Sequence, residues 1–215
     1  MKYKAVIFDM DGVITDSESP YINNFPILCK EQGYNIETKD IKNTLGTSYE
    51  YSKNYFLNKY GIDFPYDTIF SYFEDLLVKM AYDGTLHLKP NVIKTLNFLK
   101  DNSILIALAS SNTEKAVFSY LDAFNIKNYF HSILCGKDIT SSKPNPEIFL
   151  KTLSNLNLSS KECIVVEDSM NGLTAAKRAG ITSVMIPDLI PYSDEISDIV
   201  DFHFNNLYEI TTLFK

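Results

Sequence analysis

The stretch VIFDMDGVITD, residues 6–16, decides the fold predicted for this chain. The apolar run at residues 5–8 predicts a buried strand, since short continuous apolar runs are typical of strands covered on both faces. Asp9 and Asp11 follow this run, and Gly12 predicts a sharp turn just after them. We therefore expect both carboxylates at the carboxyl end of the strand, which is where open α/β sheets bind their ligands.

The pair Asp9 and Asp11 has both a functional and a structural interpretation. Two carboxylates held close together repel each other unless a proton or a cation lies between them. Hard oxygen ligands of this kind suit Mg²⁺, which usually keeps water ligands and takes further oxygens from a phosphate substrate. Alternatively, Asp-Gly is a common turn pair, and an aspartate near a helix start commonly caps the helix. The rest of the chain has to decide between the two.

The composition limits the class of protein. The chain has 215 residues, 45% of them hydrophobic, which is enough for one large domain or for a domain with an insert. Its formal net charge is −7, so nucleic acid and anionic membrane surfaces are not expected as partners. The longest apolar run, residues 104–109, is far too short to cross a membrane, and the first residues do not have the pattern of a cleaved leader.

The cysteines and histidines do not predict a disulfide or a zinc site. Cys29, Cys135 and Cys163 are far apart, form no CxxC pair and are odd in number. This pattern is typical of free thiols in a reducing compartment, and we expect a cytoplasmic protein. The histidines are equally scattered, without the spacing of zinc ligands.

Residues 16–87 differ from the rest of the chain because they predict only helices. Apolar residues recur there at three- and four-residue spacing, most clearly in a stripe over residues 70–80. The expected amphipathic helices are residues 21–31, 39–44, 49–60 and 66–82. We interpret the many aromatic side chains as packing rather than as a ligand cage. The predicted organisation is a small all-helical cap domain, residues 16–87, inserted into a core domain made of residues 1–15 and 88–215.

After residue 90 the sequence alternates between helix and strand patterns. Strands are predicted at residues 104–109, 131–135, 162–166 and 182–186. Helices are predicted directly after residue 90 and at residues 114–124, 147–156 and 171–179. Alternation of this kind predicts an α/β fold with a parallel sheet and right-handed crossover connections.

Polar residues follow several of these strands. Ser110 follows the second strand, Lys143 lies beyond the third, and Glu167 and Asp168 follow the fourth. Each has an ordinary alternative, as a helix cap or a solvated loop lysine. In a parallel sheet, however, all the carboxyl ends lie at one edge, so these residues are expected to meet Asp9. Carboxylates suit a cation, while a lysine and a hydroxyl suit phosphate oxygens, so the sequence favours phosphoryl transfer.

Four segments resemble the motifs of the haloacid dehalogenase superfamily, in that family's order and spacing: DMDGV (9–13), Ser110, KPNP (143–146) and EDSMNG (167–172). The helical insert resembles the cap of the subgroup that contains beta-phosphoglucomutase and small sugar-phosphate phosphatases. The resemblance covers nearly the whole chain. It implies a Rossmann-like three-layer core with a parallel sheet, a small all-helical cap inserted after the first strand, and an enzyme that depends on Mg²⁺.

The resemblance also implies a role for each matching residue. Asp9 would be the nucleophile that forms an aspartyl-phosphate, and Asp11 would be the general acid and base. The substrate phosphate would be held by Ser110, Ser111, Asn112 and Lys143. The metal would be bound by Asp9, by the backbone carbonyl of Asp11, and by Glu167 and Asp168.

The cap departs from beta-phosphoglucomutase at the positions that bind a second phosphate. Tyr21 lies where that enzyme has a histidine, residues 46–49 lie where it has an arginine, and Phe73 lies close to where it has a lysine. A mutase has to hold a bisphosphate, and the distal phosphate requires a cation in the cap. These departures argue for hydrolysis of a monophosphate, unless Lys53 or Lys79 supplies the missing charge.

The leading prediction is therefore a Mg²⁺-dependent phosphatase that acts on a small phosphorylated metabolite, with a phosphosugar mutase as the alternative. A dehalogenase is disfavoured because its chemistry requires neither Mg²⁺ nor Asp11. A receiver-type signalling module also forms an aspartyl-phosphate, but it is much shorter and has no cap. The expected partner is a small-molecule phosphate ester, and the expected oligomeric state is a monomer.

Overall fold

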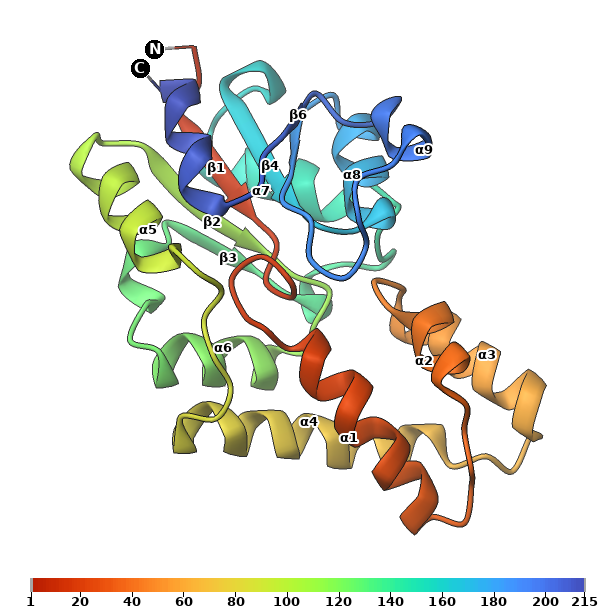
Figure 1. Cartoon of the computed structure of the whole chain (residues 1–215). Helices are drawn as coiled ribbons and strands as arrows, with labels where there is room; N and C mark the ends of the chain where they lie inside the picture. Colours follow the sequence, from red (N-terminus) through yellow and green to blue (C-terminus); the bar gives the residue numbers. More distant parts are fainter. Residues whose placement is uncertain (1, 215) are drawn as a thin grey trace.

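The sheet of this protein lies between helices, with a helical cap beyond the carboxyl ends of its strands (Figure 1). The computed structural model of the chain describes residues 2–214. Its six strands are parallel and follow the order β3-β2-β1-β4-β5-β6. The strands are β1 (Ala5–Phe8), β2 (Leu105–Ala109), β3 (Ser132–Leu134), β4 (Cys163–Glu167), β5 (Thr182–Met185) and β6 (Phe202–His203). The predicted fold, a Rossmann-like three-layer core with a cap inserted after the first strand, is confirmed.

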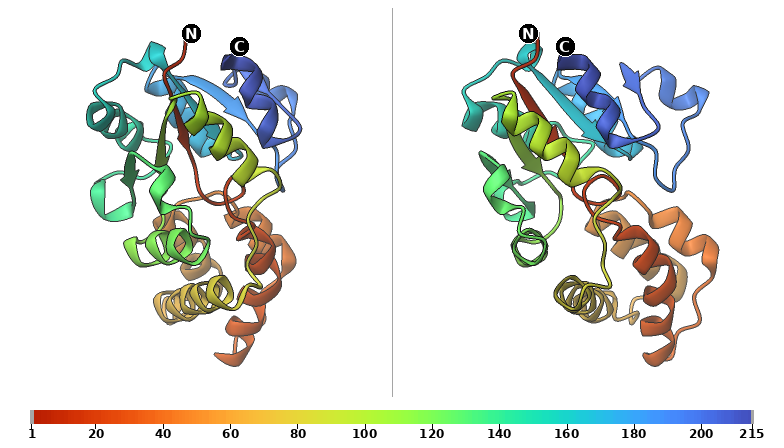
Figure 2. Two further views of the ribbon diagram at one scale, coloured as in Figure 1. Left: turned by 90° about the vertical axis from the view of Figure 1, so that its left-hand side faces the viewer. Right: turned by 60° about the vertical axis from the view of Figure 1, so that its left-hand side comes forward.

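The connections between the core strands contain helices, which suits a parallel sheet because its strands need long crossovers. The α-helices of the core are α5 (Val92–Asp101), α6 (Glu114–Ala123), α7 (Glu147–Leu156), α8 (Met170–Arg178) and α9 (Asp194–Ser197). The 3₁₀ helices are η1 (Lys127–Tyr129), η2 (Gly136–Asp138), η3 (Ser160–Glu162) and η4 (Leu207–Phe214). Figure 2 shows their arrangement from two further sides.

Strand β1 lies inside the sheet, and its side chains alternate between two apolar cores. Val6 and Phe8 belong to a core that includes residues of α5, α6 and η4. Ala5 and Ile7 belong to a second core on the other face, with residues of α7 and α8. All four side chains are fully buried. Burial on both faces explains why this strand is a continuous apolar run rather than an alternation of apolar and polar residues.

The cap is a group of helices packed around aromatic side chains. Its helices are α1 (Glu18–Glu31), α2 (Thr38–Thr44), α3 (Tyr49–Tyr60) and α4 (Tyr66–Asp83). The ring centroid of Phe25 lies 5.6 Å from that of Phe56, 5.8 Å from that of Phe73 and 6.0 Å from that of Tyr66. Most of the cap's aromatic residues are therefore core packing, as the sequence suggested.

Two linkers join the cap to the core, and they run side by side. Thr15 in the first linker pairs with Leu88 in the second in an antiparallel bridge. The backbone N–H of Asp16 donates to the carbonyl of His87 at 3.0 Å. These pairs lie at the predicted boundaries between cap and core, whose exact residues stay a prediction.

The predicted helices and strands agree closely with the structure, and the differences have local reasons. Helix α1 begins at Glu18 rather than at residue 21, since Pro20 in its first turn is compatible with helix. The short elements β6 and α9 were not predicted, because two to four residues are too few to show a period. None of the helices within residues 2–214 is long and apolar enough to span a lipid bilayer.

Candidate active site

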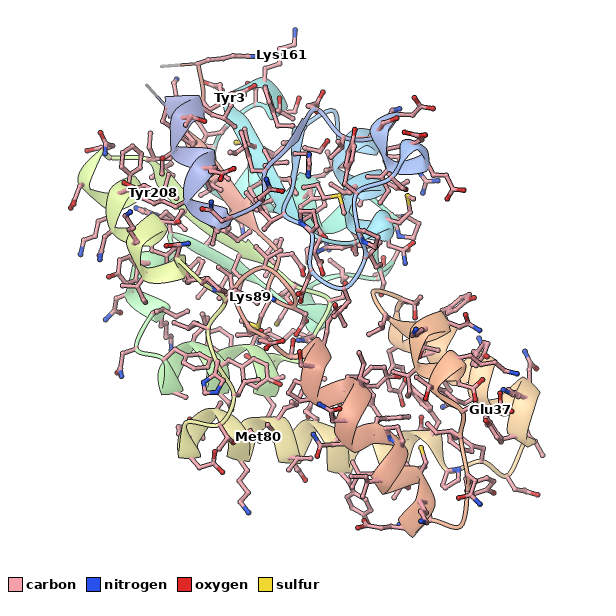
Figure 3. All side chains as sticks on the ribbon, in the orientation of Figure 1. Tyr3, Glu37, Met80, Lys89, Lys161 and Tyr208 are labelled. Carbon is pink, nitrogen blue, oxygen red and sulfur yellow. The ribbon has the colours of Figure 1, made fainter. Side chains whose placement is uncertain are left out.

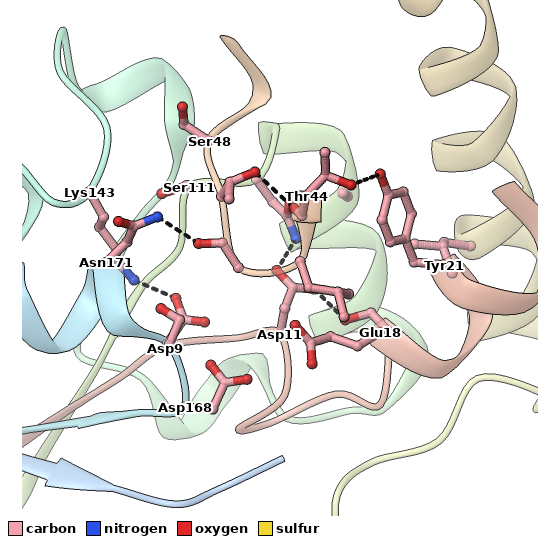
Figure 4. A pocket seen from close by; sticks show the side chains of 18 of the residues that line it. Asp9, Asp11, Glu18, Tyr21, Thr44, Ser48, Ser111, Lys143, Asp168 and Asn171 are labelled. Carbon is pink, nitrogen blue, oxygen red and sulfur yellow. Dashed lines mark hydrogen bonds and ion pairs between the residues drawn. The ribbon is translucent and has the colours of Figure 1, made fainter. Parts of the chain in front are cut away.

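The ends of β1, β2 and β4 bring the predicted site residues together (Figure 4). Asp9 and Asp11 follow β1, residues 110–112 follow β2, and residues 167–168 lie at the end of β4. Lys143 reaches the same place from the loop between η2 and α7. The structure therefore brings these residues into one group, as the sequence predicted, while their individual roles stay predictions.

The turn after β1 depends on glycine. Gly12 has φ +69°, a left-handed conformation that residues with a Cβ rarely adopt. A Cβ atom at this position would also overlap the carboxylate of Asp168. Gly12 therefore allows the turn that carries Asp11 to lie directly against the acid at the end of β4.

Lys143 is a buried ammonium group with acceptors on several sides. Its Nζ donates to Asp9 Oδ1 at 2.5 Å, to Glu167 Oε1 at 2.7 Å and to the carbonyl of Ala109 at 2.9 Å. Burial alone would lower the pKa of Lys143, but the two carboxylates outweigh it and raise the pKa above its ordinary value. The lysine is therefore charged and fixed in position beside Asp9.

Glu167 fixes the other side of this lysine. One carboxylate oxygen accepts from Lys143, and the other accepts from the hydroxyl of Ser169 at 3.0 Å and from the N–H of Asp168 at 3.2 Å. Gly172 makes room for this carboxylate, since a Cβ at that position would overlap it. Glu167 is thus a rigid acceptor for Lys143 as well as a candidate metal ligand.

Asp11 is held by two side-chain donors. The hydroxyl of Ser17 donates to its Oδ1, and the amide of Asn112 donates to its Oδ2 at 2.7 Å. Burial raises the pKa of Asp11 above its ordinary value, although these hydrogen bonds act in the opposite direction. A raised pKa favours the protonated form of a carboxyl group, which suits a general acid.

Asp9, Glu167 and Asp168 could together hold a metal ion. Each offers a carboxylate oxygen, and these oxygens lie within 4.8 Å of one another. Burial raises the pKa of Asp168, and it also raises the pKa of Asp9 despite the neighbouring Lys143. A divalent cation would relieve this crowding, because it favours the charged form of each acid. The hard oxygen donors of these three residues fit Mg²⁺.

The residues predicted to bind phosphate lie at different depths. Ser111 and Asn112 line the cavity above Asp9. Ser110 is fully buried, and its hydroxyl accepts a hydrogen bond from the backbone N–H of Asn112 at 3.1 Å. In this structure, Ser110 therefore shapes the loop, and its contact with phosphate stays a prediction.

Two neighbouring cavities lie between the cap and the strand ends. The first, of about 180 Å³, lies over Asp9 and Asp11. The second, of about 490 Å³, lies between the cap and residues 111–113. Tyr21 and Glu74 of the cap line both cavities. Cavities of this size suit a small molecule rather than a macromolecule.

Hydrogen bonds hold the cap against the core in this structure. The hydroxyl of Thr113, at the start of α6, donates to the carboxylate of Glu74 on α4. The side-chain amide of Asn171, at the start of α8, donates to the carbonyl of Gly46 at 2.9 Å. These two hydrogen bonds join the cap to the side of the core that carries the strand ends.

The cavities are acidic on the cap side. Among the described residues that line either cavity, Lys143 is the only lysine or arginine. The cap lysines that could have supplied a cation do not line them: Lys53 pairs with Asp67 at 2.8 Å, and Lys79 is exposed. Glu74 instead adds a negative charge to both. The predicted absence of a cap cation for a second phosphate agrees with this arrangement.

Several residues around the site are not among those predicted from the sequence. Ser17 and Glu18 follow directly after the opening stretch, but neither was linked to Asp11 or to the metal. Asp188 lies just beyond β5, so the rule that acids after strands meet at one edge would have found it. Glu74 had no such signal, because it lies on a cap helix far from the core in sequence.

Comparison with known proteins identifies the class of this protein. The sequence model of the haloacid dehalogenase-like hydrolase family matches residues 6–186, so the chain belongs to this family. The predicted family and the predicted enzyme class, a hydrolase, are confirmed.

Relatives within the family include phosphatases. The phosphorylated carbohydrates phosphatase of Thermotoga maritima is 29% identical over 182 residues, which cover 84% of this chain and 83% of that protein. Hexitol phosphatase B of Escherichia coli (strain K12) is 24% identical over 210 residues, covering 96% and 94%. The crystal structure of CbbY from Rhodobacter sphaeroides in complex with phosphate has the same fold, with a TM-score of 0.85 and 22% identity over 97% of this chain and 96% of that one.

Proposed function

We propose that this protein is a Mg²⁺-dependent phosphatase that releases phosphate from a small phosphorylated sugar or polyol through an aspartyl-phosphate. The observation that carries the proposal is the position of Asp9, between the ammonium of Lys143 at 2.5 Å and the acids Glu167 and Asp168. A carboxylate held between a fixed ammonium group and a bound cation stays ionised and can attack phosphorus. The names of the relatives, a phosphorylated carbohydrates phosphatase and a hexitol phosphatase, support the substrate class.

The first half of the reaction transfers the phosphoryl group to the enzyme. A carboxylate oxygen of Asp9 forms a bond to phosphorus, and the bond between phosphorus and the substrate oxygen breaks. Asp11, held by Ser17 and Asn112, gives its proton to that leaving oxygen. Lys143 offsets negative charge on the phosphoryl oxygens, and bound Mg²⁺ would supply further charge neutralisation there.

The second half releases phosphate. Asp11, now ionised, takes a proton from water as the water oxygen bonds to phosphorus. The bond between phosphorus and Asp9 breaks, so inorganic phosphate leaves and both carboxyl groups return to their starting states. The same residue acts as acid and then as base, which is why its raised pKa matters.

The acidic cap side favours an uncharged leaving group. A second phosphate in the cavities would lie near Glu74 and Glu18 without a cap cation to pair with. The rings of Tyr21 and Phe70, together with the hydroxyl groups of the cap, offer surfaces that suit a sugar or polyol. We therefore propose hydrolysis of a monophosphate. The mutase alternative would require a bisphosphate to be held at this acidic surface.

Phosphate release with Mg²⁺ tests the proposal directly. We expect turnover of p-nitrophenyl phosphate, and higher kcat/KM for hexose and hexitol monophosphates than for glucose 1,6-bisphosphate or phosphoglycolate. The Asp9→Asn variant prepared in parallel should release no phosphate and thus controls for contaminating phosphatases. Absence of phosphate release from every substrate in the presence of Mg²⁺ would refute the proposed function.

A second experiment separates hydrolysis from mutase chemistry. The enzyme is given beta-glucose 1-phosphate with a catalytic amount of glucose 1,6-bisphosphate, and glucose 6-phosphate and free phosphate are followed separately. We expect no formation of glucose 6-phosphate beyond the background. Glucose 6-phosphate formed much faster than phosphate would show that a mutase is the correct class.

We further propose that the protein acts in the cytoplasm as a monomer. Cys29, Cys135 and Cys163 are buried free thiols, as is usual in a reducing compartment. Light scattering should give the mass of a single chain, 24.5 kDa. A dimer mass at micromolar concentration would contradict the monomer.

A further inference from the structure

A second group of acids shares Asp168 with the proposed metal ligands, and its other two members have no part in the chemistry described above. Glu18, Asp168 and Asp188 each offer a carboxylate oxygen, and these oxygens lie within 4.8 Å of one another. Glu18 begins α1, Asp168 follows β4 and Asp188 lies beyond β5. Asp168 is shared with the first group, and Figure 4 shows its carboxylate facing that of Glu18. The second group therefore continues the first on the side away from Lys143.

Two oxygens of this group are buried without a hydrogen-bond partner. Glu18 is 8% exposed, and its Oε2 has no hydrogen-bond partner within residues 2–214. Asp188 Oδ2 is also buried without a hydrogen-bond partner among these residues, although Lys89 Nζ donates to Asp188 Oδ1 at 2.6 Å. A buried acceptor without a donor is costly, and such groups generally mark a bound water or ion. These two oxygens therefore indicate a donor or an ion at this group of acids.

The charges of the surrounding side chains indicate the charge of this ligand. The carboxylates in the two groups and at the adjoining general acid are Asp9, Asp11, Glu18, Glu167, Asp168 and Asp188. Among the described residues, only the ammonium groups of Lys89 and Lys143 form ion pairs with these acids. The excess of negative charge excludes an anion between Glu18 and Asp188 and requires a donor or a cation.

We propose that Glu18 and Asp188 are positioning residues of the metal site, whose free oxygens accept hydrogen bonds from water ligands that Mg²⁺ keeps beside Asp168. The inference rests on the Mg²⁺ site of the proposed function. Mg²⁺ is usually bound through few carboxylates and keeps several waters. Acceptors for those waters orient the ion and increase its affinity. Asp168 would bind the metal from its shared position, while Glu18 and Asp188 hold the hydrated side.

This arrangement also connects the metal site to both linkers of the cap. Glu18 directly follows the first linker. Lys89, whose Nζ donates to Asp188, belongs to the second linker, where Figure 3 labels it. The Thr15–Leu88 bridge ties the two linkers together. The two linkers that join the cap to the core therefore also position Glu18 and Asp188, the proposed acceptors for the water ligands of the ion.

Calorimetric titration with Mg²⁺ tests the proposal without measuring activity. Wild-type protein, Glu18→Gln and Asp188→Asn are compared with Asp16→Asn, which removes a neighbouring linker carboxylate that belongs to neither acid group. We expect one Mg²⁺ per chain in all four proteins. Its affinity should fall about 10- to 100-fold in Glu18→Gln and Asp188→Asn, and it should change little in Asp16→Asn.

Thermal melting supplies the second measurement and shows that the variants fold. In EDTA, Glu18→Gln should melt at a higher temperature than wild type, because it removes an unpartnered charge from a crowded group of acids. Added Mg²⁺ should raise the melting temperature of wild type more than that of Glu18→Gln. A residue with a merely structural role would instead lower the melting temperature in EDTA when it is replaced.

Four results would overturn the proposal. Unchanged Mg²⁺ affinity in Glu18→Gln and Asp188→Asn would exclude the positioning role while leaving the proposed function intact. An equal loss of Mg²⁺ affinity in Asp16→Asn would show that the overall negative charge, and not the position of Glu18 and Asp188, determines the affinity. Two Mg²⁺ ions per wild-type chain, with one lost in each variant, would show a second directly bound ion instead. Absence of Mg²⁺ binding to the wild type would overturn the metal site of the proposed function as well.

Discussion

Two groups of buried carboxylates in this protein have opposite surroundings. In the cap, Asp40 is fully buried and is supplied with donors. These donors are the Tyr55 hydroxyl at 2.7 Å, the Glu37 backbone N–H at 2.9 Å, the Lys59 ammonium and the Tyr60 hydroxyl. Burial alone would raise the pKa of Asp40, but these hydrogen bonds outweigh it and hold the pKa well below its ordinary value.

At the strand ends, in contrast, the effect of burial on the carboxylate pKa values outweighs that of the hydrogen bonds and ion pairs. Burial raises the pKa of Asp9, Asp11 and Asp168 above the ordinary values, and it raises the pKa of Glu18 to about 7. Within residues 2–214, Glu18 and Asp188 each keep a buried oxygen that lacks a donor. These acids are close together, and the two lysines beside them do not supply enough donors.

The difference separates a structural acid from functional ones. A buried carboxylate with all its donors stabilises the fold, as Asp40 ties α2 to α3. Carboxylates that are crowded and short of donors cost stability until a cation or substrate is bound, and such groups cluster at functional sites. The comparison predicts opposite results when the two kinds of acid are neutralised.

The largest effect is expected for the nucleophile. Asp9→Asn should lower kcat by at least about 10³-fold, because an amide oxygen is a very poor nucleophile toward phosphorus. Its free energy of unfolding should be unchanged or higher, because one crowded charge is removed. Phosphate release and chemical denaturation measure the two quantities. Substantial residual activity in pure protein would remove Asp9 from its proposed role.

Removal of the metal should abolish activity at the strand ends without affecting the acid in the cap. EDTA should stop phosphate release and Mg²⁺ should restore it, while Ca²⁺ should support it poorly because its larger, looser ligand shell misplaces the nucleophile. Mg²⁺ at about 100 times its Kd should stabilise the fold by about 2.7 kcal/mol. The Asp40→Asn variant should show the same response to Mg²⁺. Full activity in metal-free buffer would contradict the proposed chemistry.

Neutralising the acid in the cap should cost stability instead of activity. Asp40→Asn should lower the free energy of unfolding by about 2–3 kcal/mol, since buried hydrogen bonds to a charged group are lost. Because the pKa of Asp40 is lowered in the folded state, its contribution is complete above the ordinary pKa of about 3.9 and is lost as the pH falls further. Asp63→Asn, on the exposed turn before α4, is the matched control.

Denaturation curves from pH 7 to pH 3 measure this contribution. The difference between wild type and Asp40→Asn should be constant near neutral pH and should shrink below about pH 4. A variant as stable as the wild type at pH 7 would show that the donors around Asp40 are equally well satisfied without its charge.

The smallest effect is expected where the two regions meet. Glu74→Gln keeps an amide oxygen for the Thr113 hydroxyl but removes a charge from the cavity wall. The ratio of kcat/KM for glucose 1,6-bisphosphate to that for a hexose monophosphate should rise about fivefold, which corresponds to about 1 kcal/mol for a solvated pair of charges. Glu50→Gln, on the exposed side of α3, should leave this ratio unchanged. An unchanged ratio in Glu74→Gln would remove that residue from substrate discrimination.

The sequence by itself determined the order of strands and helices in the core, the helical insert and most of the site. Apolar runs and helical periods located β1, β2, β4 and β5, because these patterns arise from burial within a single segment. Asp9, Lys143 and Asp168 could be grouped before their distances were known, because a parallel sheet brings the carboxyl ends of its strands to one edge.

Only the tertiary structure decided which of these polar groups have partners. The pairing of Lys143 with Glu167, the room that Gly172 leaves for that carboxylate and the free oxygen of Glu18 all depend on distances between segments remote in sequence. Local sequence patterns do not contain those distances. The sequence around a carboxylate, such as a following glycine or serine, is the same whether or not a donor from a remote segment pairs with it. For the same reason, Asp40 and Glu18 are both acids at the start of a cap helix in the sequence, and only their neighbours in space make one structural and the other a candidate for metal binding.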